Sequence, residues 1–333
     1  MIRLAIAGCG LIGSRHAEAV NKHDRSELAC LIEPDIEKTR DFDCPVVESI
    51  QDIQNSIDGV IIATPTHLHE EQAVDAMKRG WPVLIEKPIA GSVGEAQAIV
   101  DTSGETGLPV LVGHHRRHHP QVQALKKILD DGRVGDVLVV NFLWGLKKPD
   151  DYFVGNWRSS AEGSPILINT VHDIDLVRYL FGEIAEINGF GQSGLRGKQR
   201  VESAVFAMRL ESGALVTVTV SDSTPAPWSF EAGTAENPNI AATGQDMLFV
   251  SGTRGAVSFP SLTVWSGSPD WSVAPTPEKS EPTSGVPLDI QLNHFLDVIE
   301  GKDTPIADAQ EGLATLAATL KMEEIARSTA LSV

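Results

Sequence analysis

The sequence predicts an α/β protein of two domains: a parallel sheet with helical crossovers, followed by a largely antiparallel sheet with one covered face. Two observations predict this fold class. Short β-branched runs alternate with amphipathic stretches up to about residue 114, and long alternating runs joined by loops follow Pro120. The length of 333 residues suits two domains of the usual size, about 150 residues each.

The first part of the chain shows strand and helix in strict succession. The expected strands are residues 4–8, 28–33, 59–64, 83–86 and 109–113, and the expected helices are 11–22, 65–78 and 93–102. A helix between consecutive strands makes the sheet parallel, with right-handed crossovers. We expect this domain to span residues 1–119.

The pattern after Pro120 predicts a second domain over residues 120–333. A helix at 121–129 precedes expected strands at 136–145, 203–210, 214–221, 247–251 and 262–265. Helical segments are expected at 165–182, 288–300 and 309–328, and surface loops at 225–244 and 266–286. Long alternating strands joined by loops are typical of antiparallel pairing with one face covered.

The net charge excludes two classes of partner. The chain has 45 acidic and 27 basic residues, a formal charge of −18. This charge repels nucleic-acid phosphates and anionic lipids, and no apolar run reaches the roughly 18 to 20 residues of a membrane span. We expect neither a nucleic acid nor a membrane as partner.

The three cysteines Cys9, Cys30 and Cys44 are odd in number and have no CxxC spacing. Neither a disulfide framework nor a zinc site is expected from them. The first residues also lack the order of a signal peptide. We therefore expect the reducing cytoplasm as the location.

A glycine motif joins the first expected strand to the first expected helix. Gly8, Gly10 and Gly13 fill the GxGxxG pattern, with Leu11 and Ile12 between the last two glycines. Gly8 permits a tight turn, Gly10 lets the backbone approach a pyrophosphate, and Gly13 allows close packing of helix and strand. The motif predicts a dinucleotide site at the N-terminus of this helix.

An acidic residue follows at the spacing that this kind of site requires. Glu33 lies 20 residues after Gly13, at the end of the second expected strand, where it can accept hydrogen bonds from a ribose. A carboxylate there repels a 2′-phosphate, which favours NAD over NADP. Lys38 and Arg40 follow closely, so NADP remains possible.

Further motifs carry a resemblance to a known family. Thr-Pro-Thr-His-Leu-His at residues 64–69 precedes Leu-Ile-Glu-Lys-Pro at residues 84–88. With Gly-His-His-Arg-Arg-His-His-Pro at 113–120, His-Asp-Ile-Asp-Leu at 172–176 and Leu-Asn-His-Phe at 292–295, this pair resembles the glucose–fructose oxidoreductase and inositol dehydrogenase family. The resemblance spans nearly the whole chain.

The resemblance implies a doubly wound Rossmann domain, then an α/β domain with an open, mostly antiparallel sheet. It also implies hydride transfer between a nicotinamide cofactor and a carbinol carbon of a sugar, inositol or related compound. The cofactor-binding residues it adds to the glycine motif and Glu33 are Thr64, Pro65, His67, Glu86, Lys87 and His114.

Two catalytic residues are implied in the same way. Lys87 matches the lysine of the Glu-Lys-Pro motif, which hydrogen-bonds the substrate oxygen and stabilises negative charge on it. The family often has a cis peptide before this proline. His172 matches the histidine assigned as general base in oxidation and general acid in reduction, and an imidazole suits proton transfer near neutral pH.

One position departs from the family. Many members that oxidise sugars have an aspartate four residues before this histidine, whereas this chain has Ile168 there and Asn169 next to it. An amide can orient a hydroxyl group but cannot accept its proton. We therefore expect Asn169 to position the substrate.

Arg116 or Arg117 is expected either to bind the substrate or to support the cleft. A stretch after a long strand of the second domain corresponds to substrate-facing loops of the family, and substrate contacts are expected there, in particular from Tyr152, Trp157 and Arg158; the stretch contains Lys147, Lys148, Asp150, Tyr152, Trp157 and Arg158. The same stretch also suits a polar loop with an aromatic anchor. We expect no metal in the histidine-rich run at 114–119, because it lacks the spacing of a recognised zinc motif.

The interpretation we favour is an NAD-dependent dehydrogenase or reductase for a sugar-like or polyol substrate, assembled as a homodimer or homotetramer. A glycosidase-like enzyme that oxidises a sugar transiently is an alternative, and it would show no net NADH. A non-catalytic NAD-binding regulator is the other, and it would bind the cofactor without turnover.

Overall fold

The computed structural model describes residues 1–154, 157–196 and 200–332, which form two compact units. The first unit comprises Met1–His119 and Gly285–Ala317, and the second comprises Pro120–Ser284 and the end of the chain from Ala318. This division differs from the expected one, because residues 285–317 pack with the first unit. Each unit has its own sheet and its own apolar core.

The first unit is built on a parallel sheet of six strands in the order β3-β2-β1-β4-β5-β6. The strands are β1 (Ile2–Ala7), β2 (Ser26–Ile32), β3 (Val46–Val47), β4 (Gly59–Ile62), β5 (Val83–Ile85) and β6 (Val110–Val112). This order reverses direction between β1 and β4, which places a ligand site at the carboxyl ends of these strands. The expected Rossmann sheet is confirmed, with the short strand β3 in addition.

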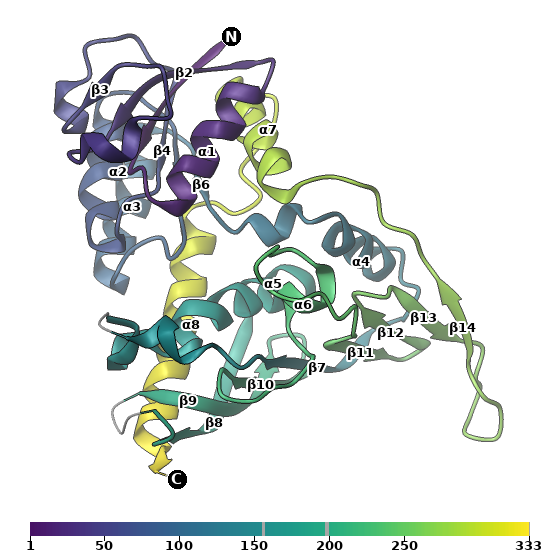
Figure 1. Ribbon diagram of the computed structural model, residues 1–333. Coiled ribbons are helices and arrows are strands. Elements are labelled where there is room, and N and C mark those ends of the chain that lie inside the picture. Colours follow the sequence, from purple (N-terminus) through teal and green to yellow (C-terminus); the bar gives the residue numbers. More distant parts are fainter. Residues whose placement is uncertain (155–156, 197–199, 333) are drawn as a thin grey trace. The chain divides into compact units, whose positions relative to one another are not determined.

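Helices cover both faces of this sheet. They are α1 (Leu11–Lys22), α2 (His69–Lys78), α3 (Val93–Thr106) and α7 (Pro287–Ile299). Helices α2 and α3 pack together on one side, and α1 and α7 on the other (Figure 1). Leu292, Phe295 and Leu296 of α7 are buried in the same core as Leu4 and Ile6 of β1. This burial explains why residues 285–317 complete the first unit.

The second unit contains a mixed sheet of nine strands in the order β14-β13-β12-β11-β7-β10-β9-β8-β15. The strands are β7 (Val137–Gly145), β8 (Ile184–Ser193), β9 (Val201–Leu210), β10 (Leu215–Ser221), β11 (Leu248–Gly252), β12 (Gly255–Phe259), β13 (Thr263–Ser266), β14 (Thr276–Lys279) and β15 (Leu331–Ser332). Pairing is antiparallel except for β10 with β7 and β15 with β8. The expected fold class is confirmed.

Helices cover one face of this second sheet (Figure 1). They are α4 (Pro120–Asp130), α5 (Val171–Phe181), the short α6 (Phe230–Thr234) and the later part of α8 (Ala309–Thr329). The core joins apolar residues of these helices to the inward positions of the strands, such as Phe142, Phe206 and Val218. α6 and β14 lie in stretches that the sequence analysis expected to be loops.

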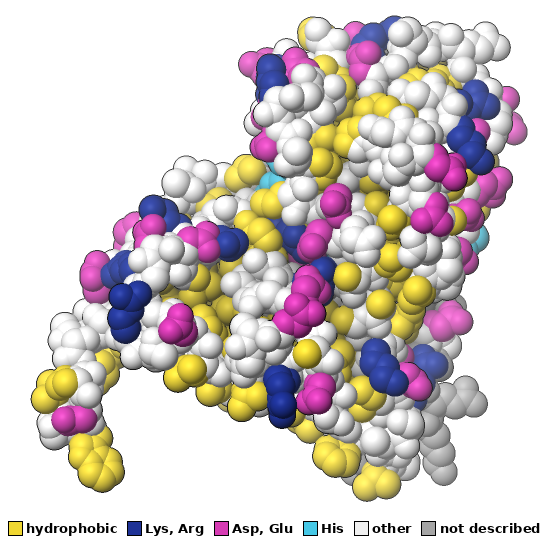
Figure 2. Space-filling view, turned by 180° about the vertical axis from the view of Figure 1, so that it is seen from behind, with side chains coloured by type: hydrophobic (Ala, Val, Ile, Leu, Met, Phe, Trp, Pro, Cys, Tyr) yellow, Lys and Arg dark blue, Asp and Glu magenta, His cyan; other side chains and the backbone are white. Residues whose placement is uncertain are grey.

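The opposite face of the second sheet exposes apolar side chains. Val139 and Leu215 are paired on neighbouring strands, as are Phe190 and Val205, and all four are exposed. Figure 2 shows hydrophobic side chains along the lower margin of the molecule in that view. Among the described residues, no helix combines the length and apolar character needed to cross a membrane.

Candidate functional site

The glycine motif forms a turn that packs against the end of the neighbouring strand. Gly8 has φ of +87°, and a Cβ atom on it would lie 2.7 Å from the Ala63 carbonyl oxygen. A Cβ on Gly13 would lie 1.9 Å from the carbonyl oxygen of Gly8. Gly8 and Gly13 are therefore required by the close packing of the turn, as the motif predicts.

Gly10 differs from the other two glycines, because a Cβ on it would meet nothing within 4 Å. Gly10 is also the N-cap of α1, where no side chain caps the helix and no acidic residue lies in the first turn. The first backbone N–H groups of α1 keep their capacity to bind an anion, and the helix dipole favours negative charge there. The turn therefore fits the pyrophosphate of a dinucleotide, and Leu11 is 86% exposed beside it.

Glu33 lies at the end of β2, where its carboxylate supports the glycine turn. Its Oε2 accepts from the Cys9 backbone N–H at 2.8 Å, and its Oε1 accepts from the Asp35 N–H at 3.1 Å. Lys38 Nζ is 3.5 Å from Oε1. Glu33 thus fixes the turn, a role that the sequence analysis missed, and its hydrogen bond to a ribose remains a prediction.

The two family motifs of the first unit are linked by a buried histidine. The ring nitrogens of His69 lie 2.9 Å from the Thr64 carbonyl oxygen and 3.0 Å from the Pro88 carbonyl oxygen. The Thr64 hydroxyl donates to Gln72 Oε1 at 2.7 Å. His69 and Gln72 were not predicted as site residues. The Thr-Pro-x-His-x-His motif does include both Thr64 and His69, the two residues that this contact joins. Pro65 and His67, at the same strand end, are exposed.

Lys87 follows β5, and the Lys87–Pro88 peptide is cis, as the resemblance implied. The preceding Glu86 is 6% exposed and lies 3.0 Å from His16 Nε2 of α1. Burial acts to raise the pKa of Glu86, but the hydrogen bond and charge of His16, with the charge of Lys87, outweigh it and lower that pKa to about 2. Glu86 is therefore an anion next to the half-buried Lys87.

The end of β6 contributes a group of buried basic side chains. His114, Arg116 and Arg117 are each 2% exposed. Arg117 donates to the Ile306 carbonyl oxygen and to Glu311 Oε2, both at 2.7 Å, so it ties the end of β6 to residues near the start of α8. This arrangement supports the second alternative for Arg117, a structural one. The substrate role of Arg116 remains a prediction.

The second unit places His172 in the first turn of α5, directly after a π turn. The π turn spans Ile166–Thr170, and α5 begins at Val171. The sequence analysis expected one helical segment here. Such turns insert a residue into a helix and occur often at functional sites. Asn169 lies in the π turn, and His172 is 7% exposed.

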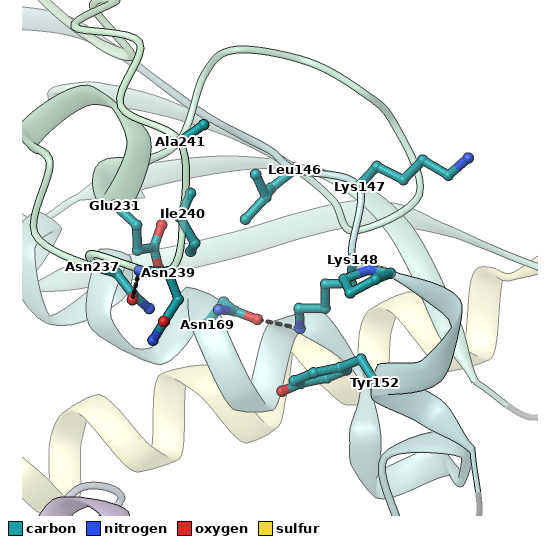
Figure 3. A pocket seen from close by; sticks show the side chains of 11 residues that line it. Leu146, Lys147, Lys148, Tyr152, Asn169, Glu231, Asn237, Asn239, Ile240 and Ala241 are labelled. Atoms are coloured by element: carbon teal, nitrogen blue, oxygen red, sulfur yellow. Dashed lines mark hydrogen bonds between the residues drawn. The ribbon is translucent and has the colours of Figure 1, made fainter.

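A cavity of about 470 Å³ lies within the second unit, beside Asn169. Its polar lining residues are Lys147, Lys148, Tyr152, Asn169, Glu231, Asn237 and Asn239. Figure 3 shows Lys148 and Tyr152 on one side of Asn169 and Glu231, Asn237 and Asn239 on the other. Leu146, Ile240 and Ala241 add apolar surface.

Lys148 is the most unusual residue of this cavity, because its ammonium is buried. Its Nζ donates to Asn169 Oδ1 at 2.7 Å and lies 5.0 Å from the centre of the Tyr152 ring. Burial lowers the pKa of Lys148 to about 8, with the charges of Arg200 and Arg158 adding to the effect and those of Asp222 and Glu231 opposing it. The sequence places Lys148 in the stretch expected to face the substrate, but it predicts neither the burial of the ammonium nor its contact with Asn169.

A network of charged side chains lies next to Lys148. Asp222 is fully buried and pairs with Arg200, whose Nη1 is 3.2 Å from Oδ1, while Lys148 Nζ is 3.7 Å from Oδ2. Arg196 Nη1 lies 3.4 Å from the same Oδ1. Arg200 is also 3.8 Å from Glu202. These contacts fix the end of β10 and hold Lys148 in place.

The expected aromatic and basic contacts are only partly described. The Arg158 guanidinium lies 4.7 Å from the centre of the Tyr152 ring, so Tyr152, Arg158, Lys148 and Asn169 form one neighbourhood. Trp157 begins the short helix Trp157–Ser159, and its side chain lies outside the described part of the structure. The predicted site residues thus form two groups, one in each unit.

Comparisons with known proteins agree with this architecture. Residues 2–114 match the family described as "Oxidoreductase family, NAD-binding Rossmann fold", and residues 122–258 match the "GFO/IDH/MocA C-terminal domain". The 1,5-anhydro-D-fructose reductase of Ensifer adhaerens is 28% identical over 281 residues, which cover 81% of this chain and 78% of that protein.

The 2,7-anhydro-N-acetylneuraminate hydratase of Escherichia coli (strain K12) is 30% identical over 192 residues, 56% of this chain. The matched segment spans 51% of that relative, so the chain covers about half of its length. Among solved structures, the WlbA dehydrogenase of Bordetella pertussis, crystallised with NADH and UDP-GlcNAcA, shares the fold with a TM-score of 0.79. It is 22% identical, with 98% of this chain and 96% of that chain covered.

The two family matches are consecutive and correspond to the two sheets described above. Together with the glycine turn and the Glu-Lys-Pro segment, they show that the chain belongs to the GFO/IDH/MocA family and begins with its NAD-binding Rossmann domain.

Proposed function

We propose that the protein is an NAD-dependent oxidoreductase that transfers a hydride between the nicotinamide and a carbinol or carbonyl carbon of a sugar, inositol or related polyhydroxylated molecule. The observation that carries the proposal lies in the first unit. The uncapped turn at Gly10 fits a pyrophosphate, and Lys87 follows β5 of the same sheet, two strands away from β1. The family match supports the same activity.

The proposed mechanism divides the work between two side chains. The bound nicotinamide supplies or accepts the hydride. Lys87 donates a hydrogen bond to the substrate oxygen and stabilises the negative charge that develops on it. His172 takes the hydroxyl proton when the carbinol is oxidised and returns a proton when the carbonyl is reduced. Asn169 orients the substrate.

The test is a screen of sugars, inositols and their acids for NADH formation from NAD, followed by absorbance at 340 nm. Net NADH with at least one compound, lost in Lys87→Ala, supports the proposal. An aryl glycoside is added to the same screen, and release of its aglycone without net NADH indicates the glycosidase-like alternative. Tight NADH binding without turnover on any compound indicates a regulator and contradicts the proposal.

The proposal includes a location in the cytoplasm, which cell fractionation tests, and assembly as a homodimer or homotetramer. The support for assembly is the apolar outer face of the second sheet, where Phe190 is 70% and Leu215 is 51% exposed. Trp271, between β13 and β14, is also fully exposed.

Light scattering at micromolar concentration is expected to give two or four times the chain mass of 35.7 kDa. Replacing Phe190 and Leu215 together by lysine is expected to shift the protein toward the monomer. A wild-type protein that is already monomeric would contradict this part of the proposal.

A further inference from the structure

We propose that the cavity beside Asn169 binds the carboxylate of a hydroxy acid, and that Lys148, hydrogen-bonded to Asn169, is the residue that selects it. This inference rests on the proposed function and narrows its substrate class from polyhydroxylated molecules in general to those with a carboxylate. It depends only on residues of the second unit.

Lys148 presents hydrogen-bond donors to the cavity. The residue is 7% exposed, yet it lines the cavity. An ammonium has three N–H donors, and the hydrogen bond to Asn169 Oδ1 uses one of them. A ligand that enters the cavity therefore meets a cation with further hydrogen bonds to give.

Lys148 belongs to a cluster of charged side chains. Three cations, Lys148, Arg196 and Arg200, contact three carboxylates, Asp222, Glu202 and Asp150. Asp222 is bound by both arginines, and Lys148 is the most distant of its three cationic partners. Lys148 is thus the cation that the protein pairs least closely with Asp222, and a ligand carboxylate can pair with it in a site where burial strengthens the interaction.

The side-chain amides of Asn169 and Asn237 line the cavity. Asn169 Oδ1 accepts from Lys148, and Asn237 Oδ1 accepts from the Asn239 backbone N–H at 3.0 Å (Figure 3). Both amides thus use their oxygens within the protein, and no described residue accepts from their NH₂ groups, which can therefore donate to a ligand. These groups are donors, and a carboxylate is an acceptor.

Glu231 is the acidic residue among those that line the cavity. Glu231 Oε2 accepts from the Trp144 indole N–H at 3.0 Å, and its carboxylate lines the cavity. A carboxylate next to the site can accept from a ligand hydroxyl, and it disfavours a dianionic phosphate more than a monoanionic carboxylate. A ligand with a carboxylate and neighbouring hydroxyl groups therefore fits both the donors, Lys148 and the two amides, and the acceptor Glu231.

The experiment is a calorimetric titration with matched probes, run with and without NADH. The acids are D-glucuronate and D-galacturonate, the neutral partners are D-glucose and D-galactose, and D-glucose 6-phosphate tests the other anion. We expect at least one acid to bind at least tenfold more tightly than its neutral partner, and more tightly than the phosphate. Cofactor binding and turnover are not needed for this result, so failure of the proposed function is seen separately.

Variants assign the preference to Lys148. Lys148→Met is expected to bring acid and neutral affinities within about threefold of each other, and Lys148→Arg to retain part of the preference. Lys127→Met, at a 75% exposed lysine of α4, is the control for loss of a charge and should leave both affinities unchanged. Thermal melting shows whether each variant is folded, and Asn169→Ala serves as a second test if Lys148→Met is not.

Three results would overturn the proposal. The first is equal or absent binding of acids and neutral sugars by the wild type. The second is an acid preference that survives in folded Lys148→Met. The third is tighter binding of the phosphate, which would mean that the cavity is specific for a different anion.

Discussion

The two units hold their functional groups in different ways. In the first unit, the functional groups are backbone N–H groups of the turn at residues 8–13. Glycines shape this turn, because the absence of a side chain lets Gly13 pack on Gly8. In the second unit, the cavity is lined by charged and amide side chains that are held by other charged side chains, such as Asp222 beneath Lys148. The first arrangement depends on glycines that are close in sequence, with support from Glu33 and Ala63. The second depends on charged and amide side chains from distant parts of the chain.

This difference teaches where cofactor binding and the proposed substrate preference are set in the protein. A backbone turn recognises what all dinucleotides share, so it suits a cofactor. A cavity of side chains changes its charge with single substitutions, so it suits the choice of substrate. Variants in the two units should therefore separate cofactor binding from substrate preference.

The largest expected effect is on turnover. Lys87→Ala should lower kcat by about 100-fold or more and leave the Kd for NADH nearly unchanged, because the lost interaction is made mainly in the transition state. Steady-state kinetics and fluorescence titration measure the two quantities. Lys78→Ala, at an exposed position of α2, is the matched control. Near-normal turnover in Lys87→Ala would show that the motif was misinterpreted.

A pair of glycine variants tests the backbone turn itself. Gly13→Ala should weaken NADH binding by about 30-fold or more and lower Tm, because its Cβ would lie 1.9 Å from the Gly8 oxygen. Gly10→Ala should weaken binding but keep Tm, because its Cβ meets no protein atom within 4 Å. Gly104→Ala, on an open position inside α3, should leave NADH binding unchanged and should not lower Tm, because alanine favours a helix more than glycine does. Normal NADH affinity in Gly10→Ala would place the pyrophosphate elsewhere.

Cofactor choice depends on Glu33, whose carboxylate supports the turn. With Glu33 at the end of β2, NADH should bind about tenfold more tightly than NADPH, a difference of roughly 1.4 kcal/mol. Fluorescence titration of both cofactors measures it, and Glu33→Gln should narrow the ratio. Equal affinities in the wild type would mean that Lys38 binds a 2′-phosphate and that the carboxylate serves the turn alone.

The smallest expected effect is on the titration of Lys148. Asn169→Asp places a carboxylate at the hydrogen bond to Lys148, and an opposite charge favours the protonated amine. The Lys148 pKa should therefore rise above its value of about 8, by about half a unit or more. Competitive labelling of lysines across a pH series measures this shift, with Asn188→Asp on β8 as control. An unchanged pKa would mean that Asn169 and Lys148 are not in contact in solution.

The first unit could be predicted well from the sequence because its signals are local. The strand, the glycine turn and α1 follow one another within residues 2–22, and Glu33 lies at a fixed distance from them. Periodicity and spacing report such neighbours directly. The contribution of α7 to the same core could not be predicted, because nothing in residues 287–299 indicates which sheet they cover.

The second unit was harder to predict because its glycines and charged side chains contact residues that are distant in sequence. β8 was missed, since its sequence contains Gly189 and Gly191, which weaken a strand pattern. A Cβ on Gly191 would lie 2.2 Å from the Ala326 carbonyl oxygen, so this glycine is there to admit α8. The buried position of Lys148 could not be predicted for a related reason. Its burial depends on Asp222 and Asn169, and neither is near it in sequence.

The divided sequence of the first unit has a consequence for the newly made chain. Its amino-terminal part ends at His119, but α7, which covers one face of its sheet together with α1, is made only after residue 285. At about 5 to 20 residues per second, a ribosome needs roughly 10 to 30 s to cover that interval. During this time residues 120–284 of the second unit are made while the surface that Leu292 and Phe295 will bury is still open. The nascent protein must therefore complete its first unit with residues that are made after most of the second unit.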